Sequence, residues 1–388
     1  MNGSESTAEP DQAMLRESES LHGRVRAFAH AAGGTEPFQD LAVAIARFQA
    51  RHSPNFARLL EATGADLSSV DQIPAVPTDA FRLARVAVHP QKFDAVRFRT
   101  SGTTSNARGV HAFRTTRTYE ELSAAFGARA LLTEGSRRMT VVALAPPPGS
   151  RPSSSLGYMM RHFMRVFDGR ALSVDTHQAR FDVDAPDRWL ATADGIDVPG
   201  LRRAALIAAD RKDGLLVLAT SLALALLLDD IDTGVLPTPA RTVVMQTGGF
   251  KGRRRDLEPS SLRSEVARAF RVSESCVVGE YGMTEMTSQL YEGCLPGGSL
   301  DAPPGVYCEP PWLRVVPVNP LTLTPVPAGE QGLAKIIDLG NVDSAVAVLT
   351  QDVVRRRGAG IELLGRSLDA PLRGCSLAVE DMVIGQGS

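Results

Sequence analysis

Three short segments combine glycines with side chains that can bind phosphate or a cation. They are Thr100-Ser101-Gly102-Thr103-Thr104-Ser105, Thr247-Gly248-Gly249-Phe250-Lys251-Gly252-Arg253 and Gly279-Glu280-Tyr281-Gly282-Met283-Thr284-Glu285. In the first segment, hydroxyl groups and uncovered backbone amides suit phosphate oxygens. No Gly-Lys-Ser/Thr follows, so it is not a Walker loop. Taken alone, this segment is equally compatible with an ordinary Ser/Thr-rich turn.

The third segment carries three different functional groups. Tyr281 offers an aromatic face for a base, Thr284 a hydroxyl for a phosphate, and Glu285 a carboxylate for Mg²⁺. The alternative is a tight turn with a surface glutamate. The second segment adds a cation, Lys251, to two adjacent glycines, and its alternative is a flexible basic loop. Lysine accounts for only four of the 42 basic residues, so a lysine in this loop weakly favours a functional role for Lys251.

Each segment follows a short apolar run. Such runs predict strands at residues 96–98, 139–145, 215–219, 242–245 and 276–278, with helical segments between them. Apolar runs of this kind are typical of strands covered on both faces, and their alternation with helices indicates a layered α/β sheet. Ligands of such sheets bind at the loops that follow the strands. We therefore expect the three segments to be ligand-binding loops.

The remaining patterns predict how the chain is divided. Residues 1–20 are expected to be a disordered lead-in, 21–90 a helical and loop-rich N-terminal segment, 91–300 the α/β core, and 301–388 a β-rich lobe ending in a cysteine tail. Strands of that lobe are predicted at 313–318, 333–339, 345–349 and 361–364. Thr118-Tyr119-Glu120-Glu121 predicts a capping box that opens a helix, and Ser153 is expected to cap the next one.

Composition excludes several classes of protein. The 388 residues carry 42 basic and 44 acidic side chains, so a net charge of −2 does not favour nucleic acid or an anionic membrane as partner. The longest apolar run, Leu215 to Leu228, is shorter than the ~20 residues of a membrane span. The N-terminus lacks a signal-peptide pattern, which predicts a cytoplasmic protein with free thiols. The histidines, including His111, show no metal-ligand spacing, and most are expected to be surface or hydrogen-bonded core residues.

The order and content of the three segments resemble the adenylate-forming (acyl-activating) enzymes, which carry a TSGTTG-type phosphate loop and a YGxTE stretch. Two further signatures, an Asp in a TGD-type turn and a Gly-Arg hinge, correspond to Asp352 and Gly365-Arg366. The resemblance implies the α/β fold of the N-terminal domain of these enzymes, with ATP and Mg²⁺ as cofactors. It implies that Tyr281 lies on adenine, that Asp352 binds ribose, and that Glu285 positions Mg²⁺. The nucleotide-binding residues it implies are Thr100, Ser101, Gly102, Thr103, Thr104, Gly248, Gly249, Tyr281, Gly282, Thr284, Asp352 and Arg366.

Within that superfamily, the chain from about residue 70 onward looks like the long-chain acyl-protein synthetases, the LuxE family. The similar stretches are TGGFKGR at 247–253, SSSLGYMM at 153–160 and RGCS at 373–376. This resemblance implies that a fatty acid is activated as acyl-adenylate, moved to Cys375, and delivered to an acyl reductase. Larger relatives add a C-terminal domain with a catalytic lysine, whereas only 22 residues follow Arg366 here. Lys251 is therefore our candidate for the catalytic cation.

Several readings remain open. Ser105 stands where the family has glycine, and Cys375 can be inert packing, although nearby arginines would lower a thiol pKa. One alternative function is a ligase that acylates coenzyme A, a carrier protein or an amine. Another is a nucleotide-binding protein without catalysis. The acid is expected to bind near residues 153–163 and the residues after Glu285.

Cys375→Ser tests the self-acylation hypothesis. Acyl-adenylate formation should persist because activation precedes attack by the thiol, whereas hydroxylamine-sensitive acyl label on the denatured protein should disappear. Cys276→Ser, Cys294→Ser and Cys308→Ser serve as controls that should retain the label. Label that persists in Cys375→Ser would place the acyl group elsewhere.

Overall fold

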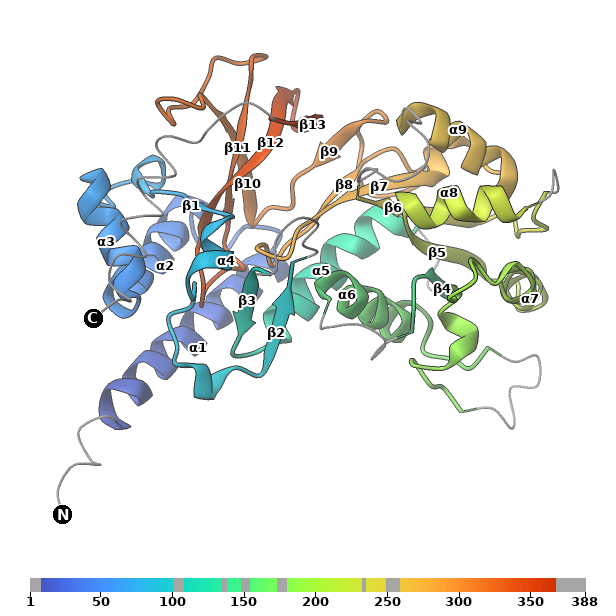
Figure 1. Cartoon of the computed structure of the whole chain (residues 1–388), viewed down its shortest axis with the longest axis horizontal. Helices are drawn as coiled ribbons and strands as arrows, with labels where there is room; N and C mark the ends of the chain where they lie inside the picture. Colours follow the sequence, from blue (N-terminus) through green and yellow to red (C-terminus); the bar gives the residue numbers. More distant parts are fainter. Residues whose placement is uncertain are drawn as a thin grey trace. The chain divides into compact units, whose positions relative to one another are not determined.

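A computed structural model describes residues 8–100, 108–133, 138–147, 154–172, 180–231, 235–248 and 259–367. Contacts divide the chain into two compact units, whose helices and strands are labelled in Figure 1. The first unit comprises Met1–Ala125, Met283–Ser288 and Glu309–Ser388. The second comprises Phe126–Gly282 and Gln289–Cys308. Each unit is therefore assembled from segments that are distant in sequence.

Parallel strands form the centre of the second unit. They run in the order β4 (Met139–Leu144), β5 (Gly214–Thr220), β6 (Thr242–Thr247) and β7 (Val277–Tyr281). Antiparallel β8 (Leu290–Glu292) and β9 (Val306–Cys308) follow beyond β7. Successive residues of a strand face opposite sides, and both Leu215 and Leu216 are fully buried. The strands predicted at 139–145, 215–219, 242–245 and 276–278 are thus confirmed, with small shifts in their bounds. Their sequences are continuous apolar runs because the sheet is covered on both faces.

Helices cover these strands (Figure 1). α7 (Val198–Asp210) packs on β4 and β5, α8 (Ser221–Asp230) on β5 and β6, and α9 (Pro259–Phe270) on β7. The apolar run Leu215 to Leu228 thus forms a buried strand and most of the helix behind it, as predicted. No helix in the described ranges is both long and apolar enough to cross a membrane.

The helix that follows β4 in the chain, α6 (Ser155–Phe163), continues as a π-helical turn over Met164–Asp168. Its cap is the Ser154 hydroxyl, which accepts a hydrogen bond from the Gly157 N–H at 3.2 Å. The predicted cap, Ser153, lies outside the described residues. Short 3₁₀ turns occupy Val70–Gln72, Gln91–Phe93, Pro186–Arg188 and Glu274–Cys276.

Antiparallel strands of the C-terminal region give the first unit its sheet. They are β10 (Leu313–Val318), β11 (Gln331–Asp338), β12 (Ala347–Arg357) and β13 (Gly360–Arg366), paired in chain order. β1 (Val76–Pro77) adds to β12 in parallel. β2 (Val96–Arg99) and β3 (Val110–Phe113) form a separate hairpin. The strands predicted after residue 300 are confirmed, although β12 extends further than expected.

The helices of the first unit begin earlier than the sequence predicted. α1 spans Ala8–His30, followed by α2 (Phe38–His52), α3 (Pro54–Thr63) and the short α4 (Ala80–Leu83). Most of the expected disordered lead-in is therefore helical. Met14 and Ser18 are buried, and Ser18 donates a hydrogen bond to Asp343. Contacts with residues more than 300 positions away order a segment whose composition alone is typical of disorder.

The predicted capping box is wrong. α5 spans Arg117–Leu131, so Thr118 lies inside the helix and is 1% exposed. Its hydroxyl contacts His22 Nδ1 at 2.8 Å and accepts from Arg26 at 3.1 Å. Both partners belong to α1, and this tertiary contact replaces the local one that the four-residue pattern suggested.

A buried ion pair fixes one end of the second unit. The Arg188 guanidinium donates to the Val141 carbonyl at 2.9 Å and to Asp168 at 3.0 Å, and both charged side chains are at most 1% exposed. Removing one partner of such a pair leaves a buried charge and costs roughly 3–5 kcal/mol. Arg170 also touches Asp168 and compensates part of that charge.

We expect Arg188→Ala to lower the free energy of unfolding by about 3 kcal/mol, because Asp168 then loses its buried partner and, within the described ranges, keeps an ion pair with the more exposed Arg170. Urea titration followed by circular dichroism measures the change. Arg202→Ala, at an exposed position of α7, should change the midpoint little. Equal midpoints for the two variants would contradict the importance of the buried pair.

Candidate active site

The described residues include part of the predicted site. Gly248, Tyr281 and Gly282 belong to the second unit, and Thr100, Thr284, Glu285, Asp352 and Arg366 belong to the first. The remaining predicted residues lie outside the described residues: Ser101, Gly102, Thr103, Thr104, Gly249, Lys251 and Cys375.

The second and third glycine-containing segments leave the same edge of the parallel sheet. β6 and β7 pair in parallel with Thr247 opposite Glu280. Gly248 therefore directly follows β6, and Tyr281 is the last residue of the neighbouring strand β7, so both lie at the carboxyl ends of the strands. Gly248 has a φ of +73°, a conformation that favours glycine. Its carbonyl accepts a hydrogen bond from the Ser221 hydroxyl, which ties Gly248 to the start of α8.

Glu280 is a buried carboxyl group to which the sequence analysis gave no role. It is 5% exposed, and the Thr247 hydroxyl donates a hydrogen bond to it. Burial raises the pKa of Glu280 to about 7. A β-carbon at residue 282 would lie 2.5 Å from its Oε1, so the glycine of the YG pair is required here for space. The sequence feature that could have singled out Glu280 is its position directly after three residues of an apolar strand.

A second buried carboxylate, Glu292, supports the end of β7. It accepts a hydrogen bond from the Gly279 N–H at 2.7 Å, and Arg263 binds both of its oxygens at 2.6 and 2.7 Å. The half-buried Tyr307 ring makes an edge contact with Tyr281, with centroids 6.4 Å apart. A β-carbon at residue 279 would lie 2.6 Å from the Tyr307 hydroxyl. Gly279 thus allows Tyr307 to support the ring predicted to cover a base.

In the first unit, Thr100 closes the base of the loop predicted to bind phosphate. Its N–H donates to the Gly109 carbonyl at 3.0 Å, and its hydroxyl accepts from the Gly109 N–H at 2.9 Å. These bonds extend the β2–β3 hairpin by one residue pair. The loop between residues 100 and 109 is therefore anchored at both ends.

The backbone around Thr284 and Glu285 is held by two side chains. The Thr284 carbonyl lies 2.7 Å from His111 Nδ1, and the Glu285 carbonyl accepts from Asn341 Nδ2 at 3.0 Å. The Glu285 side chain is largely buried, with the residue 9% exposed. Sequence analysis expected His111 to be a surface or core residue and did not single out Asn341, because neither pairing is visible in local sequence.

Asp352 and Arg366 lie together on paired strands. They face each other in the register of β12 and β13, and Arg366 Nε donates to Asp352 Oδ1 at 3.0 Å. The arginine side chain is 60% exposed and the aspartate 14%. The structure therefore brings together the two residues expected from the TGD-type turn and the Gly-Arg hinge.

The expected acyl-binding region is packed in its described part. Met159, Met160 and Phe163 of α6 are at most 1% exposed. The Tyr291 hydroxyl contacts the Met159 sulfur at 3.8 Å, and a β-carbon on Gly127 would lie 2.6 Å from the Phe163 ring. This face of the helix therefore belongs to the core of the second unit, and the expected pocket is not found among these side chains.

Among the described residues, no three His, Cys, Asp or Glu side chains gather as a metal cluster. Mg²⁺ does not need one, since it is held by one or two carboxylates together with water and substrate phosphates. A single acidic side chain in a segment predicted to contact phosphate, such as Glu285, is compatible with this mode. Cys294 is unsuited to nucleophilic chemistry, because burial raises the pKa of its thiol to about 11.

Comparison with known proteins identifies the fold. No family model and no curated protein matches the sequence. Solved structures of 2-hydroxyisobutyryl-CoA ligase are similar. An open conformation in complex with 2-HIB-AMP and CoA gives a TM-score of 0.55 at 14% identity, covering 91% of this chain and 75% of the ligase. The chain shares the fold of this ligase.

Two further states of that ligase give similar values. The postadenylation complex with 2-HIB-AMP has a TM-score of 0.54 at 14% identity, covering 91% of this chain and 68% of the ligase. The thioesterification state with 2-HIB-AMP and CoA has a TM-score of 0.53 at 15% identity, covering 93% and 69%. The predicted α/β fold class is thereby confirmed.

Glu280 makes stability depend on pH. Its pKa near 7 lies above its ordinary value of 4.5, so the folded state binds this proton more tightly than the unfolded state. The resulting stabilisation is complete below about pH 4.5 and is lost as pH rises through about 7. We expect Glu280→Gln to remove a pH-dependent contribution of about 3 kcal/mol.

Urea midpoints at about pH 5 and about pH 8 measure this effect. The wild-type midpoint should fall more between these values than that of Glu280→Gln. Glu330→Gln, at an exposed turn, should follow the wild type. Parallel profiles for wild type and Glu280→Gln would contradict the assigned pKa.

Proposed function

We propose that this protein activates a carboxylic acid with ATP, forming an acyl-adenylate and pyrophosphate, and then transfers the acyl group to a thiol. The observation that carries the proposal is the pairing of Thr247 with Glu280. Gly248 directly follows β6 and Tyr281 ends the neighbouring parallel strand β7, and loops at the carboxyl ends of such strands are where α/β sheets bind ligands, which supports the proposal. The similar 2-hydroxyisobutyryl-CoA ligase, whose structures contain 2-HIB-AMP, supports the same chemistry.

In this proposal, each segment handles one part of the nucleotide. Residues Thr100 to Thr104 hold the phosphates, Tyr281 covers adenine, and Asp352 binds the ribose hydroxyls. Gly248, Gly249 and Gly282 leave room for the nucleotide, and Arg366 forms the hinge beside Asp352. Thr284 contacts phosphate.

Glu285 would hold Mg²⁺, and the ion would offset negative charge on the phosphates when bound. The work of the protein is electrostatic, because charge develops on the α-phosphate as the carboxylate oxygen attacks it. The new bond joins the acyl oxygen to phosphorus, and the bond to pyrophosphate breaks. Lys251 is our candidate for a second positive charge at this centre.

The acceptor completes the reaction. A thiolate attacks the acyl carbon, AMP leaves, and a thioester forms. We propose Cys375 as this thiol, with a fatty acyl group passed on to an acyl reductase or carrier protein, in the manner of the long-chain acyl-protein synthetases. Coenzyme A is the second candidate acceptor, favoured by the presence of CoA in two of the similar ligase structures.

Glu285→Gln tests the activation step. Losing one hard oxygen ligand for Mg²⁺ should lower ATP–pyrophosphate exchange by about 10²-fold or more, as when one preorganised stabilising group is removed. Exchange is measured with a panel of carboxylic acids of increasing chain length.

Glu330→Gln is the matched control, since it removes an exposed carboxylate and should exchange like the wild type. Wild-type rates in Glu285→Gln would remove the assigned metal role. Binding of ATP without exchange for any acid would favour a nucleotide-binding protein without catalysis.

A further inference from the structure

His111 joins β3, the strand after the loop predicted to bind phosphate, to Thr284 of the YGMTE segment. It lies on β3 and is 2% exposed. Its ring packs edge-on against Phe81, with centroids 5.5 Å apart, and lies tilted against Phe113, with centroids 4.3 Å apart. Nδ1 lies 2.7 Å from the Thr284 carbonyl oxygen, and Nε2 lies 2.8 Å from the Ser344 hydroxyl. Both ring nitrogens are therefore engaged.

These partners define the tautomer of His111. A carbonyl oxygen only accepts, so Nδ1 carries the hydrogen and donates it to Thr284. Nε2 is then the acceptor for the Ser344 hydroxyl. Burial lowers the pKa of His111 to about 4, so the ring is neutral near pH 7 and keeps this arrangement. His111 thus presents one directed N–H to the backbone next to Glu285.

We propose that His111 is a positioning residue that fixes the Thr284–Glu285 segment for binding Mg·ATP. The inference rests on the proposed function, since it assigns the segment a role in nucleotide binding. Asn341 acts on the following peptide by donating to the Glu285 carbonyl at 3.0 Å and to the Ala345 carbonyl at 2.9 Å. Consecutive carbonyls are therefore held by separate side chains.

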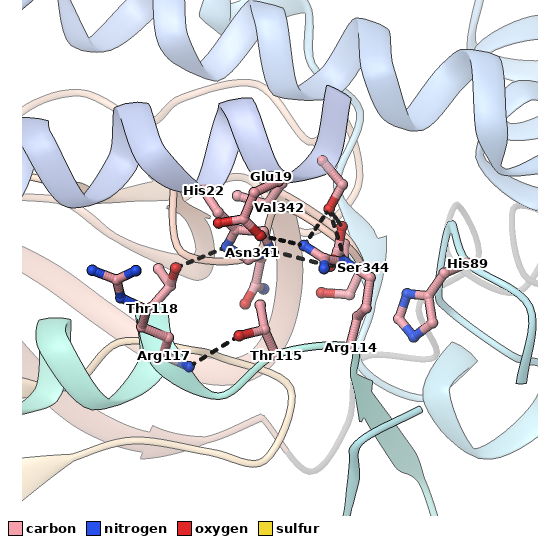
Figure 2. A network of polar contacts seen from close by, with 12 residues as sticks. Glu19, His22, His89, Arg114, Thr115, Arg117, Thr118, Asn341, Val342 and Ser344 are labelled. Atoms are coloured by element: carbon pink, nitrogen blue, oxygen red, sulfur yellow. Dashed lines mark hydrogen bonds and ion pairs between the residues drawn. The ribbon is translucent and has the colours of Figure 1, made fainter. Parts of the chain in front are cut away.

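The support behind His111 is itself anchored by charge. Ser344 follows Asp343, which is 7% exposed. Asp343 binds Ser18 and His22 of α1, with His22 Nε2 at 3.1 Å, and Arg114 at 3.2 Å. Figure 2 shows Glu19 and His22 reaching from α1 toward the loop that carries Asn341 and Ser344.

The pKa of Asp343 reports how firmly this anchor is held. Burial alone would raise it, but the hydrogen bond and charge of His22 and the charge of Arg114 hold it far below its usual range. Asp343 is therefore ionised, and a buried carboxylate with these partners cannot move without losing them. The loop that presents Ser344 to His111 is therefore tied to α1 and to Arg114 through Asp343.

Two substitutions at residue 111 separate positioning from packing. In His111→Asn, the amide nitrogen takes the place of Nδ1 and can still donate to Thr284. In His111→Phe, the ring contacts with Phe81 and Phe113 remain, but the N–H is lost. Dissociation constants for Mg·ATP are measured by calorimetry, and thermal midpoints are recorded for each variant.

We expect His111→Phe to weaken Mg·ATP binding about tenfold or more, since small misplacements of binding groups cost up to about 10²-fold. His111→Asn should stay within about threefold of the wild type. Wild-type affinity in His111→Phe, or equal losses in both folded variants, would overturn the proposal.

Ser344→Ala provides a second test if His111→Phe does not fold. The Ser344 hydroxyl donates to Nε2 and thereby favours the tautomer of His111 that carries its hydrogen on Nδ1. Without this hydroxyl, the affinity for Mg·ATP should fall at least about threefold. Unchanged affinity would count against His111. Binding of Mg·ATP without pyrophosphate exchange would defeat the proposed function but leave this test valid. Failure of the wild type to bind Mg·ATP would defeat both.

Discussion

Strands β4 to β7 have no solvent-facing side, and this constraint determines where polar groups can be placed in the second unit. Within the strands, nearly every side chain must be apolar. Thr220, Thr247 and Glu280 form a row across the carboxyl ends of β5, β6 and β7, because Thr220 pairs with Thr247 and Thr247 with Glu280. A slip of one residue would separate Glu280 from the Thr247 hydroxyl that binds it, so this buried hydrogen bond helps to fix the register. These three polar side chains therefore lie at the carboxyl ends of the strands, beyond the apolar middle of the sheet.

In the first unit, a polar loop is held in place without the hydrogen bonds of a β-sheet. Residues 284–288 are fixed through their peptide groups. His111 and Asn341 bind the carbonyls of Thr284 and Glu285, and Asp338 accepts the N–H groups of Thr287 and Ser288 at 2.9 and 2.8 Å. Burial raises the pKa of Asp338, and these N–H groups offset part of that rise. Satisfied backbone groups therefore replace secondary structure as the source of rigidity.

Local sequence was sufficient for the elements whose causes are local. The strand over 313–318 was predicted with its observed bounds, and the run 215–228 divided into β5 and α8 because an apolar pattern changes from strand to helix near Thr220. Prediction failed where distant partners decide. Thr118 satisfies a local capping pattern but is bound by α1, and α1 itself begins where composition indicated disorder.

The same reason explains which site residues were missed. Glycine and hydroxyl motifs are contiguous, so Tyr281, Thr284 and Glu285 could be selected from one segment. His111 acts on a residue 173 positions away, and Asn341 on one 56 positions away. A histidine or asparagine in isolation carries no record of such a partner. Glu280 was within the motif, but its raised pKa results from its burial. The apolar residues before it in the sequence are only weak evidence of that burial.

The anchoring of α1 by the C-terminal region has a consequence for the order of folding during synthesis. Ser18 and Asp343 are separated by 325 positions, and β1 pairs with β12 across a similar distance. At about 5–20 residues per second, the ribosome needs on the order of 15 to 65 s to make the intervening chain. During that time, Ser18 and His22 of α1 lack Asp343, and β1 lacks β12. The first unit therefore completes its polar anchor and its sheet only after the last strands have been made.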